Sequence, residues 1–346
     1  MNEKDRRLAE FCQRNGYEGV LIRRRSNIAW ASDGADVHCN AASPLGVASL
    51  LWTPGKKLVL TSNIESARLA EEEFGSDWEF QAAPWWASDG RPTGHFVTDY
   101  PDDVIADLRY SLTDDELSRV RALGAESAEV LCNGMQLIEP GQSEHEVAGE
   151  LISQLRRRGI HCPVVMVAAD DRIARFRHPI PTSRRIEQAV EVIVCTRRKG
   201  LFVCLTRILH FGPISDDLRR KHDAVCRIDE VLRSTTRPGV RWCDVLAAGI
   251  RAYEATGYPD EWKKHHQGGP LGYEPRDFLA TPTETRTVLE NQLVGWNPSI
   301  TGTKSEDTIL SSGEIITAMP DWPMCGSRPD ILCRRAPRRA AAPTPS

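Results

Sequence analysis

Long apolar runs are missing from this chain of 346 residues, and so is any large excess of charge of one sign. A membrane-spanning helix needs ~20 apolar residues, whereas the best run, Val164–Ala169, has the length of a strand. The N-terminus is polar and shows no apolar region of a signal peptide. The formal net charge is −4, from 44 Lys and Arg against 48 Asp and Glu. We therefore expect a cytoplasmic protein that binds neither membranes nor nucleic acid.

Paired cysteines are also missing, although the chain has ten cysteines. No Cys-x-x-Cys motif occurs, which argues against a zinc ribbon and against a thioredoxin-type site. In a reducing compartment, scattered cysteines are usually small buried hydrophobic residues. This interpretation fits most of the ten.

What is present is the composition of a globular protein, with 40% hydrophobic and 27% charged residues, in a chain long enough for two domains. Residues 1–112 alternate strand-like and helix-like segments, including helices predicted at Lys4–Asn15 and Ile64–Phe74. A boundary is predicted near Leu112, because Thr113-Asp-Asp-Glu116 is a capping box that begins a helix reaching about Ile138.

The second domain, residues 113–323, continues with a helix from Ser143 to about Arg158. Further elements are predicted as three strands (Val164–Ala168, Val190–Cys195, Leu201–Thr206) and two helices (Ser215–Ser234, Trp242–Thr256). Residues 324–346 are rich in Arg, Ala and Pro, which predicts a disordered tail. The fold class is α/β (α+β).

Six short segments of the second half occur in a familiar order. They are Glu139-Pro-Gly-Gln-Ser-Glu, Arg177-His-Pro-Ile-Pro-Thr, Gly200-Leu-Phe-Val-Cys-Leu-Thr-Arg, Gly268-Gly-Pro-Leu-Gly-Tyr-Glu, Trp296-Asn-Pro and Ser305-Glu-Asp-Thr. This order resembles the pita-bread domain shared by creatinase, aminopeptidase P, prolidase and methionine aminopeptidase. The resemblance implies that residues 1–112 are a creatinase-like N-terminal domain and that the protein is a homodimer.

In the metallopeptidases of this family, two Asp, one His and two Glu hold two divalent metal ions. The positions that match them here are Cys195, Cys204, Gly269 (or Pro270), Asn297 and Glu306. Only Glu306 is retained. Two thiols, an amide and one carboxylate do not provide the oxygen ligands of a paired Mn or Co site. The resemblance therefore predicts no metal and no other cofactor, and we reject the conventional metallopeptidase mechanism.

The resemblance also assigns roles to particular side chains. His178 matches a histidine that acts as general acid/base in creatinase, a member that works without metal, and an imidazole suits that role. Glu306 is predicted to anchor a cationic group or to assist proton transfer. Asn297 and Arg276 are predicted to bind substrate, the latter through a carboxylate. Each of these residues could instead have only a structural role in a loop, turn or strand.

Four further residues are predicted to line the substrate site. Cys195 and Cys204 have three interpretations: space-filling thiols, a soft zinc site with Glu306 and His265 or His266, or a nucleophile activated by His178. His266 follows a lysine pair beside the lost metal-ligand turn, so it either reaches the cleft or lies on the surface. Trp30 belongs to a loop, Trp30–His38, that is expected to line a pocket.

The function predicted from these residues is a metal-independent, creatinase-like hydrolase of a C–N bond in a small amino-acid-like substrate. One alternative is an Xaa-Pro-type metallopeptidase with an altered metal site. A second alternative, from a different class, is a non-catalytic pita-bread binding module.

Overall fold

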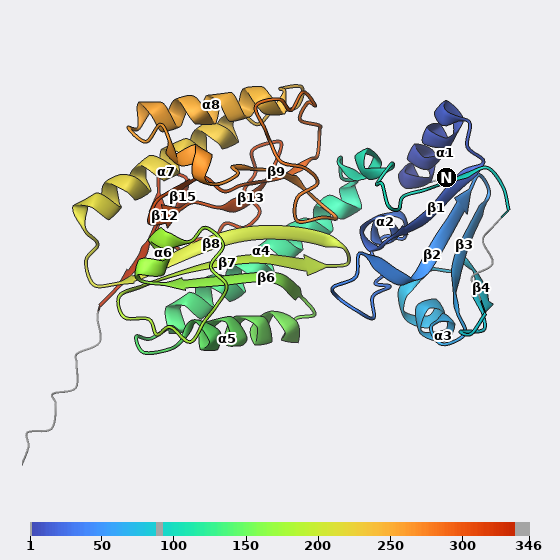
Figure 1. Ribbon diagram of the computed structural model, residues 1–346, viewed down its shortest axis with the longest axis horizontal. Coiled ribbons are helices and arrows are strands. Elements are labelled where there is room, and N and C mark those ends of the chain that lie inside the picture. Colours follow the sequence, from blue (N-terminus) through green and yellow to red (C-terminus); the bar gives the residue numbers. More distant parts are fainter. Residues whose placement is uncertain (1, 88–92, 336–346) are drawn as a thin grey trace, which may run out of the picture.

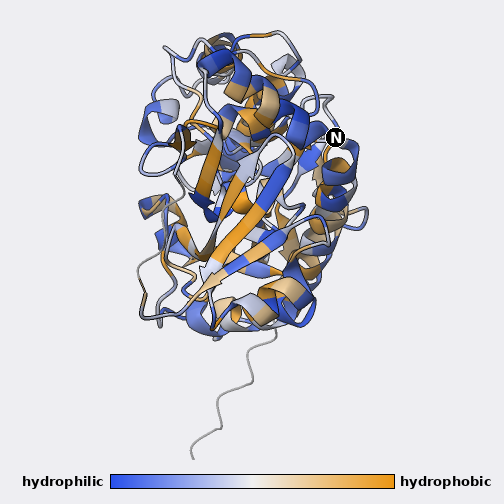
Figure 2. Cartoon of the chain, turned by 90° about the vertical axis from the view of Figure 1, so that its right-hand side faces the viewer, coloured by the Kyte–Doolittle hydropathy of each residue, from blue (hydrophilic) through white to orange (hydrophobic). Residues whose placement is uncertain are grey.

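The N-terminal part of the chain folds around a five-stranded sheet with the strand order β4-β3-β2-β1-β5 (Figure 1). The computed structural model describes residues 2–87 and 93–335. The strands are β1 (Gly19–Arg24), β2 (Leu45–Thr53), β3 (Lys56–Ser62), β4 (Glu79–Ala83) and β5 (Phe96–Thr98). Figure 2 views this lobe from its outer side and shows hydrophobic stretches along the strands. Their buried residues form the core of the lobe.

Short helices surround this sheet. They are α1 (Glu3–Asn15), α2 (Arg25–Ala31), α3 (Ser66–Arg68) and the single turns Leu69–Glu73 and Ala106–Arg109. Helix α1 confirms the predicted Lys4–Asn15 helix and ends at Gly16, whose φ of 73° suits glycine. The predicted Ile64–Phe74 helix is instead a three-residue α3 that passes into a π-helical turn.

A long helix begins the larger lobe. In α4 (Asp114–Leu137), the hydroxyl of Thr113 accepts from the backbone N–H of Glu116, and the carboxylate of Glu116 accepts from the N–H of Thr113, which confirms the predicted capping box. The same reciprocal bonds begin α5 (Glu144–Arg157) at Ser143 and Glu146. These two helices cover one face of the main sheet (Figure 1).

The main sheet has the strand order β16-β8-β7-β6. It consists of β6 (His161–Ala169), β7 (Ala189–Arg198), β8 (Leu201–Phe211) and β16 (Leu332–Arg334). All eleven residues of β8 are buried, which is typical of a central strand covered on both faces. The hairpin of β7 and β8 places Cys195 directly opposite Cys204. The one-turn helix α6 (Asp171–Arg175) follows β6.

A second layer packs above this sheet and carries α7 (Asp216–Thr235) and α8 (Trp242–Ala255) (Figure 1). Its strands are short. They are β9 (Gly268–Leu271), β10 (Leu293–Trp296), β11 (Ser299–Ile300), β12 (Thr303–Lys304) and β13 (Asp307–Leu310). A 3-10 turn (Glu261–Lys264) precedes β9. The two helices share one core cluster with β10, β11 and β13.

The C-terminal segment differs from the prediction. Residues 324–334, expected to belong to a disordered tail, form β14 (Met324–Cys325), β15 (Arg328–Pro329) and β16, and β16 pairs in parallel with β8. The side chain of Arg328 is buried between Asp229 and Asp307, with N–O distances of 2.6 and 3.5 Å. A buried arginine between two carboxylates holds the segment in place. The rest of the predicted tail lies outside the described residues.

Buried polar contacts connect the two lobes. Lys4 of α1 lies 2.8 Å from the carboxylate of Glu116, which also accepts from the hydroxyl of Tyr273 at 2.6 Å. Within the part of the chain that the structure describes, no helix is long and apolar enough to cross a membrane.

Candidate functional site

Glu306, which the resemblance matches to a metal ligand, lies at the centre of a buried group of polar side chains. Its carboxylate accepts from the hydroxyl of Thr206 at 2.6 Å and lies 2.9 Å from Nζ of Lys304. Its other oxygen accepts from the guanidinium of Arg276 at 3.2 Å. Burial alone would raise the pKa of Glu306, but the two cations outweigh it and lower the pKa to about 2. Glu306 is therefore a fixed negative charge at neutral pH.

The strands explain why these side chains converge. The backbone N–H of Thr206 in β8 donates to the carbonyl of Glu306, which aligns the turn between β12 and β13 with the main sheet. Arg276 follows β9, and a Cβ at Gly295 of β10 would lie 3.1 Å from its guanidinium. Glycine at 295 thus leaves the space that the Arg276 side chain occupies.

The two cysteines predicted at metal-carboxylate positions meet at this group. Their sulfurs lie 3.0 Å apart, and Arg276 donates to Sγ of Cys204 at 3.3 Å. The contact between the thiols, with Arg276 beside it, lowers the pKa of Cys204, while the same contact raises the pKa of Cys195. Cys204 is completely buried. The structure therefore brings Cys195, Cys204, Arg276 and Glu306 together, as the sequence predicted.

These residues do not fit the paired metal ions of the resembled metallopeptidases. The set contains one carboxylate, Glu306, which already contacts the cations of Arg276 and Lys304. It also contains two thiols, and Sγ of Cys204 accepts a further hydrogen bond from Arg276. Gly269 contributes no side chain. Two further positive ions would have to enter beside Arg276 and Lys304, which electrostatic repulsion opposes. The residues at these positions therefore do not support a reaction step that passes through a metal pair.

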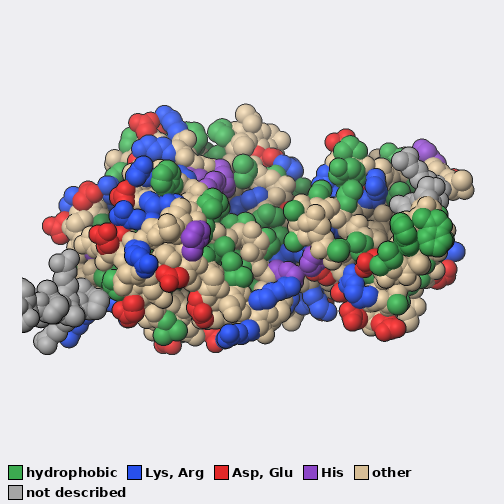
Figure 3. Space-filling model, turned by 60° about the horizontal axis from the view of Figure 1, so that its bottom comes forward, with side chains coloured by type: hydrophobic (Ala, Val, Ile, Leu, Met, Phe, Trp, Pro, Cys, Tyr) green, Lys and Arg blue, Asp and Glu red, His purple; other side chains and the backbone are tan. Residues whose placement is uncertain are grey.

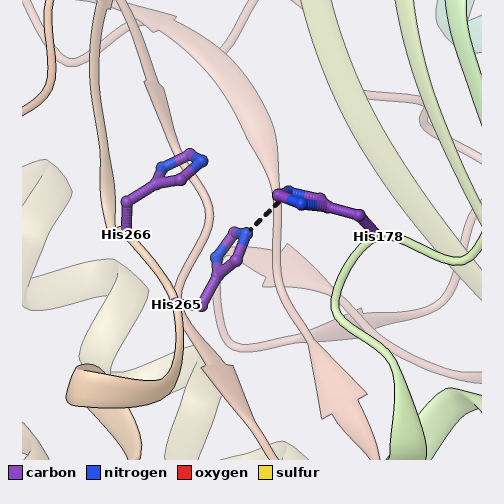
Figure 4. Close-up of side chains that lie close together, drawn as sticks. All are labelled: His178, His265 and His266. Atoms are coloured by element: carbon purple, nitrogen blue, oxygen red, sulfur yellow. Dashed lines mark hydrogen bonds between the residues drawn. The ribbon is translucent and has the colours of Figure 1, made fainter.

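Three histidines lie beside this group (Figure 4). His178 comes from the segment between α6 and β7, and His265 and His266 precede β9. The Nε2 atoms of His178 and His265 are 3.0 Å apart, and the rings of His265 and His266 stack with centroids 4.3 Å apart. His178 is exposed, and the other two are half-buried. Figure 3 shows histidine side chains reaching the surface of the larger lobe close to lysines and arginines.

Burial, together with nearby positive charge, keeps these rings neutral at pH 7. Burial, followed by the positive charge of Lys304, lowers the pKa of His178 and lowers that of His265 to about 3. Burial and Arg276 lower the pKa of His266 to about 4. His266 is half-buried, and its ring centroid lies 6.0 Å from that of His178.

Two predicted substrate residues take different places. Asn297 is buried next to the histidine segment, where its backbone N–H donates to the carbonyl of Gln267, and its Oδ1 has no hydrogen-bond partner among the described residues. Trp30, in contrast, is fully buried in the core of the N-terminal lobe. Its ring has no exposed surface for a substrate, so the expectation that it lines a pocket is wrong for this chain.

Sequence reasoning missed Lys304 and Glu191. Lys304 stands two residues before Glu306. In an extended segment this spacing places both side chains on one face, so the sequence did carry a signal that Lys304 lies beside Glu306. Glu191 lies within the apolar strand β7 and lines a small cavity with His265 and Lys304. Burial raises the pKa of Glu191 to about 7. A buried carboxyl inside an otherwise apolar strand was the available signal.

Comparison with known proteins decides the family. Residues 118–325, more than half of the chain, match the model of metallopeptidase family M24. The chain belongs to this family. The match confirms the resemblance to creatinase, aminopeptidase P and prolidase, and it places the chain in a family of C–N hydrolases.

Relatives of this M24 chain agree in fold. It is 22% identical to an Xaa-Pro dipeptidase of Pyrococcus horikoshii over 90% of this chain and 94% of the relative. Among solved structures, an Xaa-Pro dipeptidase from Bacillus anthracis superposes with a TM-score of 0.75 at 17% identity, covering 96% and 99% of the two chains. An X-Pro aminopeptidase from Thermotoga maritima gives 0.73 at 16% identity, covering 96% and 100%. These similarities confirm the predicted pita-bread fold class.

Proposed function

We propose that this M24 chain hydrolyses a C–N bond in a small amino-acid-like substrate without the paired metal ions of the resembled metallopeptidases. One observation carries the proposal: Arg276 and Lys304 both contact Glu306, the only retained ligand position. Fixed cations can polarise a carbonyl and stabilise developing negative charge without reorganising during the reaction. Two side chains thus supply positive charge that metal ions supply in metallopeptidases.

His178 is the proposed general acid/base. It is the exposed member of the histidine group, and its only hydrogen bond to a described residue joins its Nε2 to His265. A neutral imidazole can accept a proton from an attacking water and deliver it to the leaving nitrogen. A C–O bond forms while the C–N bond breaks, and the proton ends on the amine product.

Substrate contacts are proposed for Asn297 and Arg276. The unpartnered Oδ1 of Asn297 is a buried acceptor, and an N–H group of a substrate would satisfy it. Arg276 is occupied by Glu306 and Cys204, so in this proposal it acts as a fixed charge and binds a substrate carboxylate only if that contact rearranges. The homodimer and the cytoplasmic location remain proposals as well.

Dipeptides that end in proline are the first substrates to test, because the similar Pyrococcus protein is an Xaa-Pro dipeptidase. Protein treated with a chelator should retain full turnover of an identified substrate. His178→Ala should lower turnover by roughly 10²–10⁴, the usual contribution of general acid–base catalysis. His145→Ala, at an exposed histidine of α5, is the matched control and should be unchanged.

Two results would contradict the proposal. Turnover that disappears with the chelator and returns with Mn²⁺ or Co²⁺ would support an altered metallopeptidase. No turnover in a broad metabolite screen, together with capture of a stable protein partner, would support the non-catalytic binding module.

A further inference from the structure

The three imidazoles of His178, His265 and His266 are spaced like ligands of a single metal ion. One ligand nitrogen from each ring lies within 4.8 Å of the other two, and the Nε2 atoms of His178 and His265 are 3.0 Å apart. Around a tetrahedral zinc ion with Zn–N bonds of 2.0–2.1 Å, two ligand nitrogens are about 3.3 Å apart. Small side-chain rotations therefore bring the ligand nitrogen of His266 within bonding distance of the same ion. Figure 4 shows the rings facing one another from two separate segments.

Two of these rings have a buried nitrogen that no other described residue contacts by a hydrogen bond. Nδ1 of His265 and Nδ1 of His266 are buried without a hydrogen-bond partner among the described residues. Histidines with a structural role are usually tied to a backbone carbonyl or a carboxylate, and His222 illustrates this with bonds to Thr303 and to the carbonyl of Pro329. The rings of the three-histidine group lack such ties.

We propose that His178, His265 and His266 bind one divalent transition-metal ion, with Zn²⁺ as the best match, at a site distinct from the carboxylate positions of the family. Imidazole nitrogen favours zinc, copper and nickel over magnesium and calcium, which prefer oxygen. Three protein ligands with an exposed His178 leave a fourth position open to solvent. This site also differs from the Cys195, Cys204 and Glu306 set considered from the sequence.

The surrounding charges influence the affinity of this site for a metal ion. Lys304 and Arg276 oppose a cation here, whereas Glu306 favours it. Glu191 shares a small cavity with His265 and Lys304. The rings are neutral at pH 7, so their lone pairs are available and binding does not have to displace protons from them.

Metal binding has a consequence that rests on the proposed function. The lone pair of His178 cannot both bind zinc and accept a proton. An ion at this site would therefore inhibit the proposed hydrolysis, so that proton transfer and metal binding compete for His178.

The test measures metal binding to the full chain without any substrate. Chelator-treated protein is titrated with Zn²⁺ by calorimetry, and with Co²⁺ while the visible absorption of the ion is recorded. We expect one ion per chain and visible bands without thiolate charge transfer. His265→Ala and His266→Ala should each weaken binding at least tenfold. His178→Gln, a change at an exposed residue, should do the same, and thermal unfolding checks that each variant is folded.

Matched variants separate the alternatives. Cys195→Ser with Cys204→Ala removes the thiols, and His38→Ala disrupts the group of Asp36, His38 and His161, the second set of possible ligands in the described residues. Both should bind zinc as the unchanged chain does. Loss of binding in either control, or full binding after His265→Ala with His266→Ala, would overturn the proposal. Because no substrate is used, these results do not depend on whether the proposed hydrolysis occurs.

Discussion

The guanidinium of Arg276 donates to Sγ of Cys204 at 3.3 Å and to the carboxylate of Glu306 at 3.2 Å. It thus joins two of the positions that the resemblance matches to metal ligands of metallopeptidases. Arg276 and Lys304 place two cations beside the carboxylate of Glu306. These residues form a polar group in which one carboxylate contacts two cations.

Glu306 should be essential for the stability of this group. Glu306→Gln removes the only carboxylate that contacts both Arg276 and Lys304 and leaves two nearly buried cations without compensation. Breaking a buried ion pair in this way costs about 3–5 kcal/mol. Urea unfolding at neutral pH measures the loss. Glu290→Gln, at an exposed glutamate, is the control, and an equal effect of both changes would contradict the structural role of Glu306.

The contact between the lobes predicts acid sensitivity. Burial would raise the pKa of Glu116, but Lys4, Thr113 and Tyr273 outweigh it and lower the pKa below 4.5. A lowered pKa in the folded state stabilises the protein above the pKa of the unfolded chain, and this contribution is lost as the pH falls below about 4.5. Lys4→Met should therefore destabilise the protein at pH 7.

The measurement compares unfolding free energies of Lys4→Met and the unchanged chain between pH 7 and pH 3. The difference should shrink towards acid pH, because protonated Glu116 no longer gains from Lys4. A difference that stays constant over this range would show that Lys4 acts through contacts other than its pairing with Glu116, such as its hydrogen bond to the carbonyl of Trp30.

The thiols of Cys195 and Cys204 should be inaccessible to alkylating reagents. Cys204 is fully buried and its sulfur contacts Cys195, whereas Cys39 and Cys333 are exposed. Brief treatment of the native protein with iodoacetamide, followed by peptide mass spectrometry, should therefore modify Cys39 and Cys333 before Cys195 and Cys204. Rapid modification of Cys204 would instead support the nucleophile interpretation. Denatured protein, in which all ten cysteines react, is the control.

Local signals predicted much of this fold. The long periodic segments and the capping boxes at Thr113 and Ser143 correctly located α4 and α5, because these signals depend only on neighbouring residues. The resemblance placed Cys195 and Cys204 at one site, and the pairing of β7 with β8 shows how their sulfurs meet. Contacts between distant segments carry no local pattern, so the approach of His178 to His265 was missed. Trp30 was misassigned because it belongs to the short helix α2 and packs into the core, whereas the sequence predicted a loop there.

The segment after Met324 is the clearest failure of composition as a guide, and it supports a final prediction. Arg328 is almost fully buried beside Asp229 and Asp307, so one arginine in an Arg-rich stretch pairs with two interior carboxylates, one of which also pairs with Arg207. Arg328→Ala should lower the free energy of unfolding by about 3–5 kcal/mol, because both carboxylates remain buried without this partner. Arg334→Ala removes a half-buried arginine that pairs with exposed Glu139, and surface pairs contribute only about 0–1 kcal/mol. Urea unfolding measures the free energy of unfolding of both variants. If Arg328→Ala and Arg334→Ala lower it by the same small amount, Arg328 does not hold the segment in place.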